Sequence, residues 1–241
     1  MLLKGKTILI TGSARRIGRT LAIAVAKAGG DLIIHHNNSP EAAEKTKQEI
    51  LELSQKAQIL QADFSDPEST SRFIDSAFSR NKIDVLINNA SIFSDLSWSE
   101  TKIDDWNKHL AINLTAPFLL SQKFGRSLIG DQKGRIINLL DWRALRPGPD
   151  HFPYTISKAG LAALTKSLAI ALAPNITVNG IALGAVLPPN DSSGSDNIIS
   201  ALPIPRWADL IEVEETLLYL LTGPSYITGE IIHLDGGRHL T

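Results

Sequence analysis

Residues 6–18, which read KTILITGSARRIG, decide the fold of this chain of 241 residues. The apolar run Thr7–Thr11 predicts a buried strand, and the amphipathic segment Ile17–Ala28 that follows predicts a helix. Gly12 can take the tight turn between them, and Gly18 can let the helix pack closely against the strand. Because a helix N-terminus offers unpaired N–H groups to an anion, the stretch predicts a turn that binds the pyrophosphate of a dinucleotide. A plain structural turn is the alternative.

The rest of the chain repeats this alternation of short β-branched runs and longer helical segments. That order predicts βαβ units, and therefore a parallel sheet with helices on its faces. We expect one α/β domain over residues 1–241, a Rossmann-type doubly wound sheet of seven parallel strands. The expected strands are Thr7–Thr11, Asp31–His35, Ala57–Ala62, Val85–Asn88, Arg135–Leu140, Thr177–Ala182 and Glu230–His233, and the expected helices are Ile17–Ala28, Pro40–Ser54, Pro67–Arg80, Ile103–Leu128, Pro153–Ala173 and Leu210–Leu221.

Composition narrows the class of protein. Lys and Arg number 24 against 25 Asp and Glu, a formal net charge of -1, which argues against general nucleic-acid binding. No apolar run approaches the roughly 18 residues of a membrane helix, and the N-terminus leads straight into a strand, so we expect neither a membrane span nor a signal peptide. The chain has no cysteine, and its six histidines lack metal-ligand spacing. We therefore expect no metal site and a cytoplasmic protein.

The segment after the second strand distinguishes the two nicotinamide cofactors. An acidic side chain there would bind the ribose 2′-hydroxyl of NAD and repel the 2′-phosphate of NADP. Residues 35–39 read His-His-Asn-Asn-Ser and contain no carboxylate, and Arg16 can reach toward an anion, so the charge argument favours NADP(H). The alternative for His35 and His36 is that both face solvent in a loop. Asp63, after the third strand, either accepts a hydrogen bond from the adenine amino group or caps its own turn.

A phenol and an ammonium lie one helical turn apart in the segment Tyr154-Thr155-Ile156-Ser157-Lys158. A cation on the same helix face favours the phenolate, which would lower the pKa of Tyr154 and make it a usable general acid or base. Lys158 can also hydrogen-bond a ribose hydroxyl. Tyrosine and lysine at this spacing are common on exposed helix faces, so the pair takes its meaning from its surroundings.

The chain resembles the classical short-chain dehydrogenase/reductase family over essentially its whole length. The resemblance rests on the order and spacing of Thr11-Gly12…Gly18, Asn88-Asn89-Ala90-Ser91, Asn113, Tyr154, Lys158, Val178-Asn179-Gly180 and Leu234-Asp235-Gly236-Gly237. It implies that Tyr154 is the acid/base, that Lys158 binds the nicotinamide ribose, and that Asn113 supports a proton relay to the lysine. The cofactor-binding residues expected from the resemblance and from the charge argument are Gly12, Arg15, Arg16, Ile17, Gly18, His36, Asn37, Asn38, Ser39, Asp63, Phe64, Asn89, Ala90, Ser91, Lys158 and Gly184.

Two departures from the general family pattern point to one branch. Asp141 replaces a serine that normally orients a carbonyl, and Arg16 replaces the middle glycine of the first motif. This combination resembles the pteridine reductases and their bacterial dihydropterin reductase relatives, as do Ser91, Phe93 and the closing residues 234–240. The residues that this resemblance implies for substrate binding are Arg16, Ser91, Phe93, Asp141 and Tyr154.

The chemistry of these side chains suits a pterin. Phe93 can stack on its flat ring, and the rigid fork of Arg16 can hydrogen-bond ring heteroatoms. Asp141 and Tyr154 can share a proton and pass it to a ring nitrogen while hydride reaches the neighbouring carbon. A carboxylate also raises the pKa of an adjacent phenol, so Asp141 and Lys158 act on Tyr154 in opposite directions. The sequence leaves open which of the two prevails.

Each assignment also has a simpler reading. Phe93 can be a core or loop aromatic, Asp141 can form an ion pair with Arg143 or Arg146, and Arg16 can bind phosphate alone. The leading hypothesis is NADPH-dependent reduction of a dihydropterin or dihydrofolate. One alternative is reduction of a 3-oxoacyl thioester or small ketone. The other is a catalytically silent nucleotide sensor, which would have no need of the complete set of acid/base residues.

Two further expectations concern a loop and the assembly. Residues 184–206 are rich in Pro, Ser, Asn and Asp without periodicity, which predicts a loop that covers the substrate. After the sixth expected strand, Leu183-Gly184 is followed by Ala185, without the proline before the glycine and the cofactor-contacting threonine after it that the family usually has. The resemblance also implies a homotetramer built on the helices Ile103–Leu128 and Pro153–Ala173. Apolar residues 161–164 would suit that packing, and the alternative is that they all face the sheet.

Overall fold

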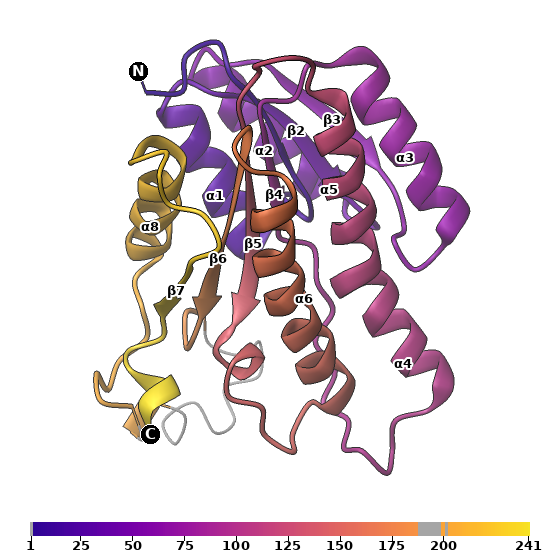
Figure 1. Ribbon diagram of the computed structural model, residues 1–241, viewed down its shortest axis with the longest axis vertical. Coiled ribbons are helices and arrows are strands. Elements are labelled where there is room, and N and C mark those ends of the chain that lie inside the picture. The colour runs from indigo at the N-terminus through magenta and orange to yellow at the C-terminus, as the bar shows by residue number, and fades with distance from the viewer. Residues whose placement is uncertain (1, 188–198, 201) are drawn as a thin grey trace.

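The computed structural model describes residues 2–187, 199–200 and 202–241, and Figure 1 shows a central sheet between layers of helices. All strand pairs are parallel, and the strand order is β3-β2-β1-β4-β5-β6-β7. The expected doubly wound parallel sheet of seven strands is therefore confirmed. Its strands are β1 (Thr7–Ile10), β2 (Asp31–His36), β3 (Ala57–Gln61), β4 (Val85–Asn88), β5 (Gly134–Asp141), β6 (Ile176–Leu183) and β7 (Ile231–Leu234).

Two layers of helices cover the sheet (Figure 1). One face carries α1 (Arg16–Lys27), α2 (Pro40–Glu52) and α8 (Leu210–Thr222), and the other carries α3 (Pro67–Arg80), α5 (Ala116–Ser127) and α6 (Phe152–Ala171). The helix α4 (Ile103–Leu110) leads into α5, and two short 3₁₀ turns, η2 (Trp142–Ala144) and η3 (Arg238–Leu240), were not expected from the sequence.

Burial on both faces explains why the first strand is apolar at every position. Ile8 and Ile10 pack into the core beneath α1, α2 and α8, whereas Leu9 packs into the core beneath α3, α5 and α6. All three side chains are fully buried. Because β1 pairs with both β2 and β4, the chain changes direction across the sheet at this strand, and open α/β sheets bind ligands at such a point, beyond the carboxyl ends of the strands.

The helix expected at Ile103–Leu128 contains a π-helical turn, η1 (Ala111–Thr115), between α4 and α5. The backbone N–H of Ala116 donates to the carbonyl five residues earlier, which is the π pattern. Pro117 has no N–H to donate to the carbonyl of Asn113, so ordinary α-helical bonding is interrupted at this point. Such turns inside helices are frequent at functional sites, and this one carries Asn113.

The expected substrate-covering loop, residues 184–206, falls largely outside the described residues. The described beginning of it is packed rather than exposed, since Ala185 and Val186 are buried. The N–H of Ala208 donates to the carbonyl of Ala185 at 2.9 Å, which holds the chain close to the end of β6. Within the described ranges, no helix is long and apolar enough to cross a lipid bilayer.

The outward face of α6 is partly apolar. Leu161 and Ala162 are buried, whereas Ala163 is exposed and Leu164 is half-buried. The alternative in which all four residues face the sheet is therefore wrong. A surface groove between α6 and the η1–α5 segment is lined by Leu114, Thr115, Phe118, Gly160, Ala163, Leu164 and Ser167. The homotetramer itself stays a prediction.

Candidate active site

The turn after β1 requires its two glycines. Gly12 has a left-handed backbone, with φ +65°, and a Cβ there would lie 2.9 Å from the Cα of Ala90. A Cβ on Gly18 would lie 2.1 Å from the carbonyl oxygen of Gly12. The turn and the first part of α1 therefore approach too closely for a side chain at either position. This arrangement sets the N-terminus of α1, the end of a helix that attracts anions, beside the turn.

The loop after β4 holds this turn in place. The side-chain nitrogen of Asn89 donates to the carbonyl oxygens of Thr11 (2.8 Å) and Gly12 (3.1 Å). In return, the hydroxyl of Thr11 accepts the backbone N–H groups of Asn89 (2.9 Å) and Ala90 (3.0 Å). Asn89 and Ala90 therefore hold the shape of the turn between β1 and α1, and their expected contact with the cofactor stays a prediction.

His35 is a site residue that the sequence reasoning missed. Its Nδ1 accepts the backbone N–H of Gly12 at 2.9 Å, and its Nε2 lies 3.2 Å from the carbonyl oxygen of Ala62. The ring also stacks on Phe64, with the centroids 4.2 Å apart. Since Nδ1 accepts, Nε2 must carry the proton, and the imidazole ties the turn after β1 to the segment that follows β3.

Burial decides the protonation state of this ring. It lowers the pKa of His35 from 6.5 to about 4, so the imidazole is neutral near pH 7. The alternative in which His35 and His36 face solvent is wrong, because β2 continues through both residues and both are buried. The apolar run Leu32-Ile33-Ile34 just before them was the signal in the sequence that the buried strand could extend this far.

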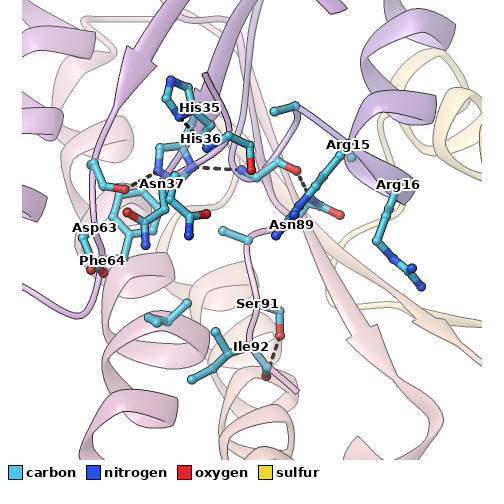
Figure 2. Close-up of a pocket in the computed structure, with 18 of the residues that line it drawn as sticks. Arg15, Arg16, His35, His36, Asn37, Asp63, Phe64, Asn89, Ser91 and Ile92 are labelled. Carbon is cyan, nitrogen blue, oxygen red and sulfur yellow. Dashed lines mark hydrogen bonds between the residues drawn. The ribbon is translucent and has the colours of Figure 1, made fainter. Parts of the chain in front are cut away.

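A cavity of about 580 Å³ lies at the carboxyl ends of β1, β2 and β4, and Figure 2 shows the side chains around it. Three cations, Arg15, Arg16 and Lys108, line it, against one carboxylate, Asp63, among its described lining residues. That balance suits a phosphorylated nucleotide. The predicted residues that line it are Gly12, Arg15, Arg16, Ile17, Gly18, His36, Asn37, Asn38, Ser39, Asp63, Phe64, Asn89, Ala90, Ser91, Phe93 and Tyr154; the unpredicted ones are Ala14, His35, Ala62, Ile92, Lys108 and Ile112.

Two residues expected at the cofactor have structural partners instead. Asp63 Oδ1 accepts the backbone N–H (2.8 Å) and the hydroxyl (2.7 Å) of Ser65, so the capping alternative is observed, and these bonds lower the pKa of Asp63. Gly184 does not line the cavity. A Cβ on Gly184 would lie 2.5 Å from the Cα of Asp235, so this glycine lets the C-terminal loop pass close to the end of β6. Contacts of both residues with the cofactor stay predictions.

Tyr154, at the start of α6, meets Asp141 at the end of β5. The phenol O–H donates to Asp141 Oδ2 at 3.2 Å. The other carboxylate oxygen accepts the backbone N–H of Arg143 at 2.9 Å and lies 3.6 Å from its guanidinium, which also donates to Asp150 Oδ2 at 2.6 Å. Both interactions expected for Asp141 are therefore present. One carboxylate oxygen accepts from the Tyr154 phenol, and the other lies against Arg143. Arg146 is not the partner, since it donates to the carbonyl of Arg238.

The charge states of the phenol and the ammonium follow from their burial. Burial, with the Asp141 carboxylate beside it, raises the pKa of Tyr154 well above its ordinary value. Burial lowers the pKa of Lys158 to about 8, although Asp141 opposes this shift. The Nζ of Lys158 donates to the carbonyl of Leu139 at 2.7 Å and lies 5.7 Å from the Tyr154 ring centroid. The sequence left open whether Asp141 or Lys158 determines the direction in which the pKa of Tyr154 shifts. Burial and Asp141 raise that pKa, so Tyr154 is a neutral phenol.

Asn113 lies in the π turn with its side chain fully buried. Its Oδ1 accepts from the hydroxyl of Ser91 (3.1 Å) and the backbone N–H of Ile92 (3.0 Å), and its Nδ2 donates to the carbonyl of Ile92 (3.1 Å) and the hydroxyl of Ser157 (3.0 Å). The side chain therefore joins the loop after β4 to α6. The expected proton relay from Asn113 to Lys158 stays a prediction.

Phe93 stands at the mouth of the cavity with 55% of its surface exposed, so it is not a core aromatic. Its ring stacks on His151 at a centroid distance of 3.9 Å and meets the edge of Tyr154 at 4.6 Å. His151 has a left-handed backbone, with φ +47°, and its Nδ1 lies 3.0 Å from the carbonyl of Ser94. The hydrogen-bonded pair of Tyr154 and Asp141 is thus bordered by an exposed aromatic ring that neighbouring side chains hold in position.

Comparison with known proteins places this site in a class. Residues 6–197 match the family model described as short chain dehydrogenase. The chain is 35% identical to the 3-oxoacyl-[acyl-carrier-protein] reductase FabG of Aquifex aeolicus, covering 98% of each chain. It is 30% identical to the 3-oxoacyl-[acyl-carrier-protein] reductase of Synechocystis, covering 98% of this chain and 97% of the relative.

Solved structures agree with the sequence relatives. FolM alternative dihydrofolate reductase 1 from Brucella suis, in complex with NADP, has a TM-score of 0.90 at 34% identity, with 98% of this chain and 96% of that chain covered. A blue fluorescent protein from a metagenomic library, in complex with NADPH, has a TM-score of 0.91 at 29% identity, with 98% and 99% covered. The expected cofactor, NADP(H), is thus the one bound in these relatives.

The cavity, with Tyr154 among its lining residues and the buried Lys158 ammonium 5.7 Å from the phenol ring centroid, fits the family match to a nicotinamide-dependent oxidoreductase. More particularly, the chain belongs to the short-chain dehydrogenase/reductase family.

Proposed function

We propose that this protein is an NADPH-dependent reductase of a dihydropterin or dihydrofolate. The observation that carries the proposal is the 3.2 Å hydrogen bond from the Tyr154 phenol to Asp141, a carboxylate where the family pattern has serine. The pair lies beside the exposed ring of Phe93, a surface on which a flat heterocycle can stack.

The backbone at Arg16 gives the proposal independent support. Arg16 has φ +51°, a left-handed conformation that costs a non-glycine residue about 1–2 kcal/mol. Glycine, which the family pattern has here, would adopt it freely. An arginine in this position needs a compensating role for its side chain. Arg16 lines the same cavity as Ser91 and Phe93. Its guanidinium could therefore bind both a cofactor phosphate and the pterin ring, and these interactions would compensate for the backbone strain.

The cavity residues fit NADPH. The glycine turn and the N-terminus of α1 suit the pyrophosphate, and Arg15, Arg16 and Lys108 suit the 2′-phosphate, with no carboxylate at the end of β2 to repel it. The complexes of the Brucella suis and metagenomic relatives with NADP and NADPH support the same assignment. When bound, the cofactor supplies a hydride to the substrate.

The protein's own residues then supply the proton. Reduction of a C=N bond needs a hydride at carbon and a proton at nitrogen, and Tyr154 is protonated because its pKa is raised by burial and by Asp141. Proton donation leaves a phenolate, whose charge is offset by the ammonium of Lys158, 5.7 Å from the ring centroid. Solvent returns the proton to the phenol after the product leaves.

Asp141 contributes orientation as well as charge. Arg143 fixes one carboxylate oxygen through its backbone N–H at 2.9 Å and its guanidinium at 3.6 Å. The oxygen facing Tyr154 can therefore accept an N–H of an aminopyrimidinone while it holds the phenol in place. A ketone offers no such donor, so this arrangement favours a pterin ring over an isolated carbonyl.

Reduction of a 3-oxoacyl thioester is the second candidate. The observation that favours it is the 30–35% identity to 3-oxoacyl-[acyl-carrier-protein] reductases over nearly the full length of both chains. Against it stands Asp141, whose two oxygens accept hydrogen bonds from Tyr154 and from the backbone N–H of Arg143 and therefore offer a ketone oxygen no donor.

The test is an NADPH-consumption assay on paired substrates, with wild type and Asp141→Ser compared on each. The substrates are dihydrobiopterin, dihydromonapterin, dihydrofolate and an acetoacetyl thioester. We expect wild type to reduce a dihydropterin, and Asp141→Ser to lose about 10²-fold or more of kcat/KM for it, because the carboxylate that orients both the Tyr154 phenol and the pterin ring is gone. Turnover of the thioester alone, with Asp141→Ser equal or faster, would exclude the pterin proposal and favour the second candidate.

A further inference from the structure

The C-terminal turn η3 holds an arginine, Arg238, against Trp142. Figure 1 shows the C-terminus beyond the carboxyl ends of β6 and β7, at the same end of the sheet as η2. The guanidinium carbon of Arg238 lies 4.4 Å from the ring centroid of Trp142, the residue after Asp141. The guanidinium carbon of Arg143 lies 4.7 Å from the same ring. Two cations therefore rest on one indole next to the proton-transfer pair.

These two arginines differ in their ionic partners. Arg143 is neutralised by Asp150, at 2.6 Å, and by Asp141, at 3.6 Å. Arg238 forms no ion pair with any carboxylate of the described residues, and its guanidinium is left with the aromatic face of Trp142. Partial burial and the repulsion of Arg143 lower the pKa of Arg238, although Asp141, Asp150 and Asp235 act at longer range in the opposite direction. Among the described residues, no carboxylate therefore contacts its guanidinium directly, although three act on its charge at longer range.

The backbone that carries Arg238 is firmly held. Arg146 donates to the carbonyl of Arg238 at 3.3 Å, and the N–H of Arg238 donates to the carbonyl of Asp235 at 3.1 Å. The buried carboxylate of Asp235 accepts the N–H groups of Gly237 (3.0 Å) and His239 (2.9 Å). An arginine on a fixed turn can bind an anion with less loss of conformational entropy than one on a free chain end.

A continuous series of ring and guanidinium contacts links this arginine to the reacting end of the site. The Phe93 ring meets Tyr154 at 4.6 Å, Arg143 lies 5.8 Å from the Phe93 ring centroid, and Trp142 contacts both Arg143 and Arg238. A substrate whose reacting ring lies on Phe93 can therefore extend its substituent over Trp142 toward Arg238.

We propose that Arg238, seated on Trp142, binds an anionic group on the substituent of the substrate, either a carboxylate or a phosphate. The inference rests on the proposed function for the identity of the reacting ring. It predicts that a dihydropterin with a charged tail, such as dihydrofolate, is preferred over one with a neutral side chain, such as dihydrobiopterin. The planar guanidinium fork matches both carboxylate and phosphate geometry.

The experiment compares KM and kcat for dihydrofolate and dihydrobiopterin in wild type, Arg238→Gln and Arg238→Lys. The matched control is Arg126→Gln, which removes an exposed cation from α5, away from the site. We expect Arg238→Gln to raise the KM for dihydrofolate by about tenfold, the low end for a lost charge-assisted hydrogen bond. The KM for dihydrobiopterin and both kcat values stay within twofold, Arg238→Lys lies between, and Arg126→Gln changes neither substrate.

Equal changes for the two substrates, or no change for either, would overturn the proposal. If wild type reduces no dihydropterin, the proposed function fails and the arginine is tested on acetoacetyl-coenzyme A against neutral acetoacetyl-N-acetylcysteamine. A rise in KM for the coenzyme A ester alone would then assign the anion as a phosphate. If nothing is turned over, titration calorimetry with folic acid and with coenzyme A, in the presence of NADP⁺, decides the matter: weaker binding of one of them by Arg238→Gln supports the proposal, and unchanged binding of both refutes it.

Discussion

The buried imidazole of His35 makes the stability of this protein sensitive to mild acid. In the native state Nδ1 is occupied by the N–H of Gly12, and burial lowers the pKa from 6.5 to about 4. Below pH 6.5 the unfolded chain therefore binds a proton that the native protein does not. Lowering the pH through this window must favour unfolding, and stability rises again as the pH increases.

The size of the effect follows from the two pKa values. The difference between the pKa of His35 in the unfolded chain and in the native protein corresponds to about 3 kcal/mol of the free energy of unfolding. Nearly all of this stabilisation is lost once the pH has fallen to about 4. Between pH 8 and pH 5 the expected loss is ~2 kcal/mol, because the unfolded state is then almost fully protonated at this histidine while the native state is not.

Two substitutions separate titration from hydrogen bonding. The side chain of His35→Asn does not titrate, but it can place an oxygen near the position of Nδ1 to accept the N–H of Gly12. In His35→Leu that N–H loses its acceptor, which costs about 1–3 kcal/mol. Because the same N–H belongs to the phosphate-binding turn, we expect His35→Leu to bind NADPH several-fold more weakly, whereas His35→Asn binds it nearly as well as wild type.

The assay is urea unfolding of the three proteins at pH 8 and pH 5, with NADPH affinity measured by fluorescence at pH 8. Comparison within each pH cancels the titration of every other group. The free energy of unfolding of wild type, relative to that of His35→Asn, should fall by ~2 kcal/mol at pH 5. An unchanged difference between the two proteins would refute the assigned protonation state, and wild-type affinity in His35→Leu would refute its role in the turn.

Two further outcomes follow from contacts of the site and of the outer helices. Asn113→Ala should lower the free energy of unfolding by about 2–4 kcal/mol in urea denaturation, because buried partners at Ile92 and Ser157 lose their hydrogen bonds. A loss below ~1 kcal/mol would contradict the role of Asn113 in joining the loop after β4 to α6. Ala163→Arg, on the groove between α6 and the η1–α5 segment, should convert the expected tetramer into a smaller species by light scattering while NADPH binding persists. A wild-type monomer would contradict that arrangement.

Much of the fold could be predicted because its signals are local. The apolar strands, the glycines of the first turn and the helical spacing of Tyr154 and Lys158 depend on residues a few positions apart. The order of these motifs also identified the family, which the comparisons confirm. The π turn at Asn113 escaped prediction, because one change of hydrogen-bond register inside a helix leaves the apolar periodicity almost unaltered.

Properties that depend on several separate segments had to come from the tertiary structure. The sequence by itself placed Asp141 and Tyr154 in the site, but not the sharing of Asp141 between the phenol and Arg143. The sequence did not decide whether the pKa of Tyr154 is raised or lowered, because desolvation depends on what packs around the phenol. The sequence left open whether His35 ends a buried strand or faces solvent in a loop, and the pairing of β2 with β1 and β3 decides for the strand. Such partners meet only when the chain folds, and the energy of a buried charge or hydrogen bond is set by that enclosure.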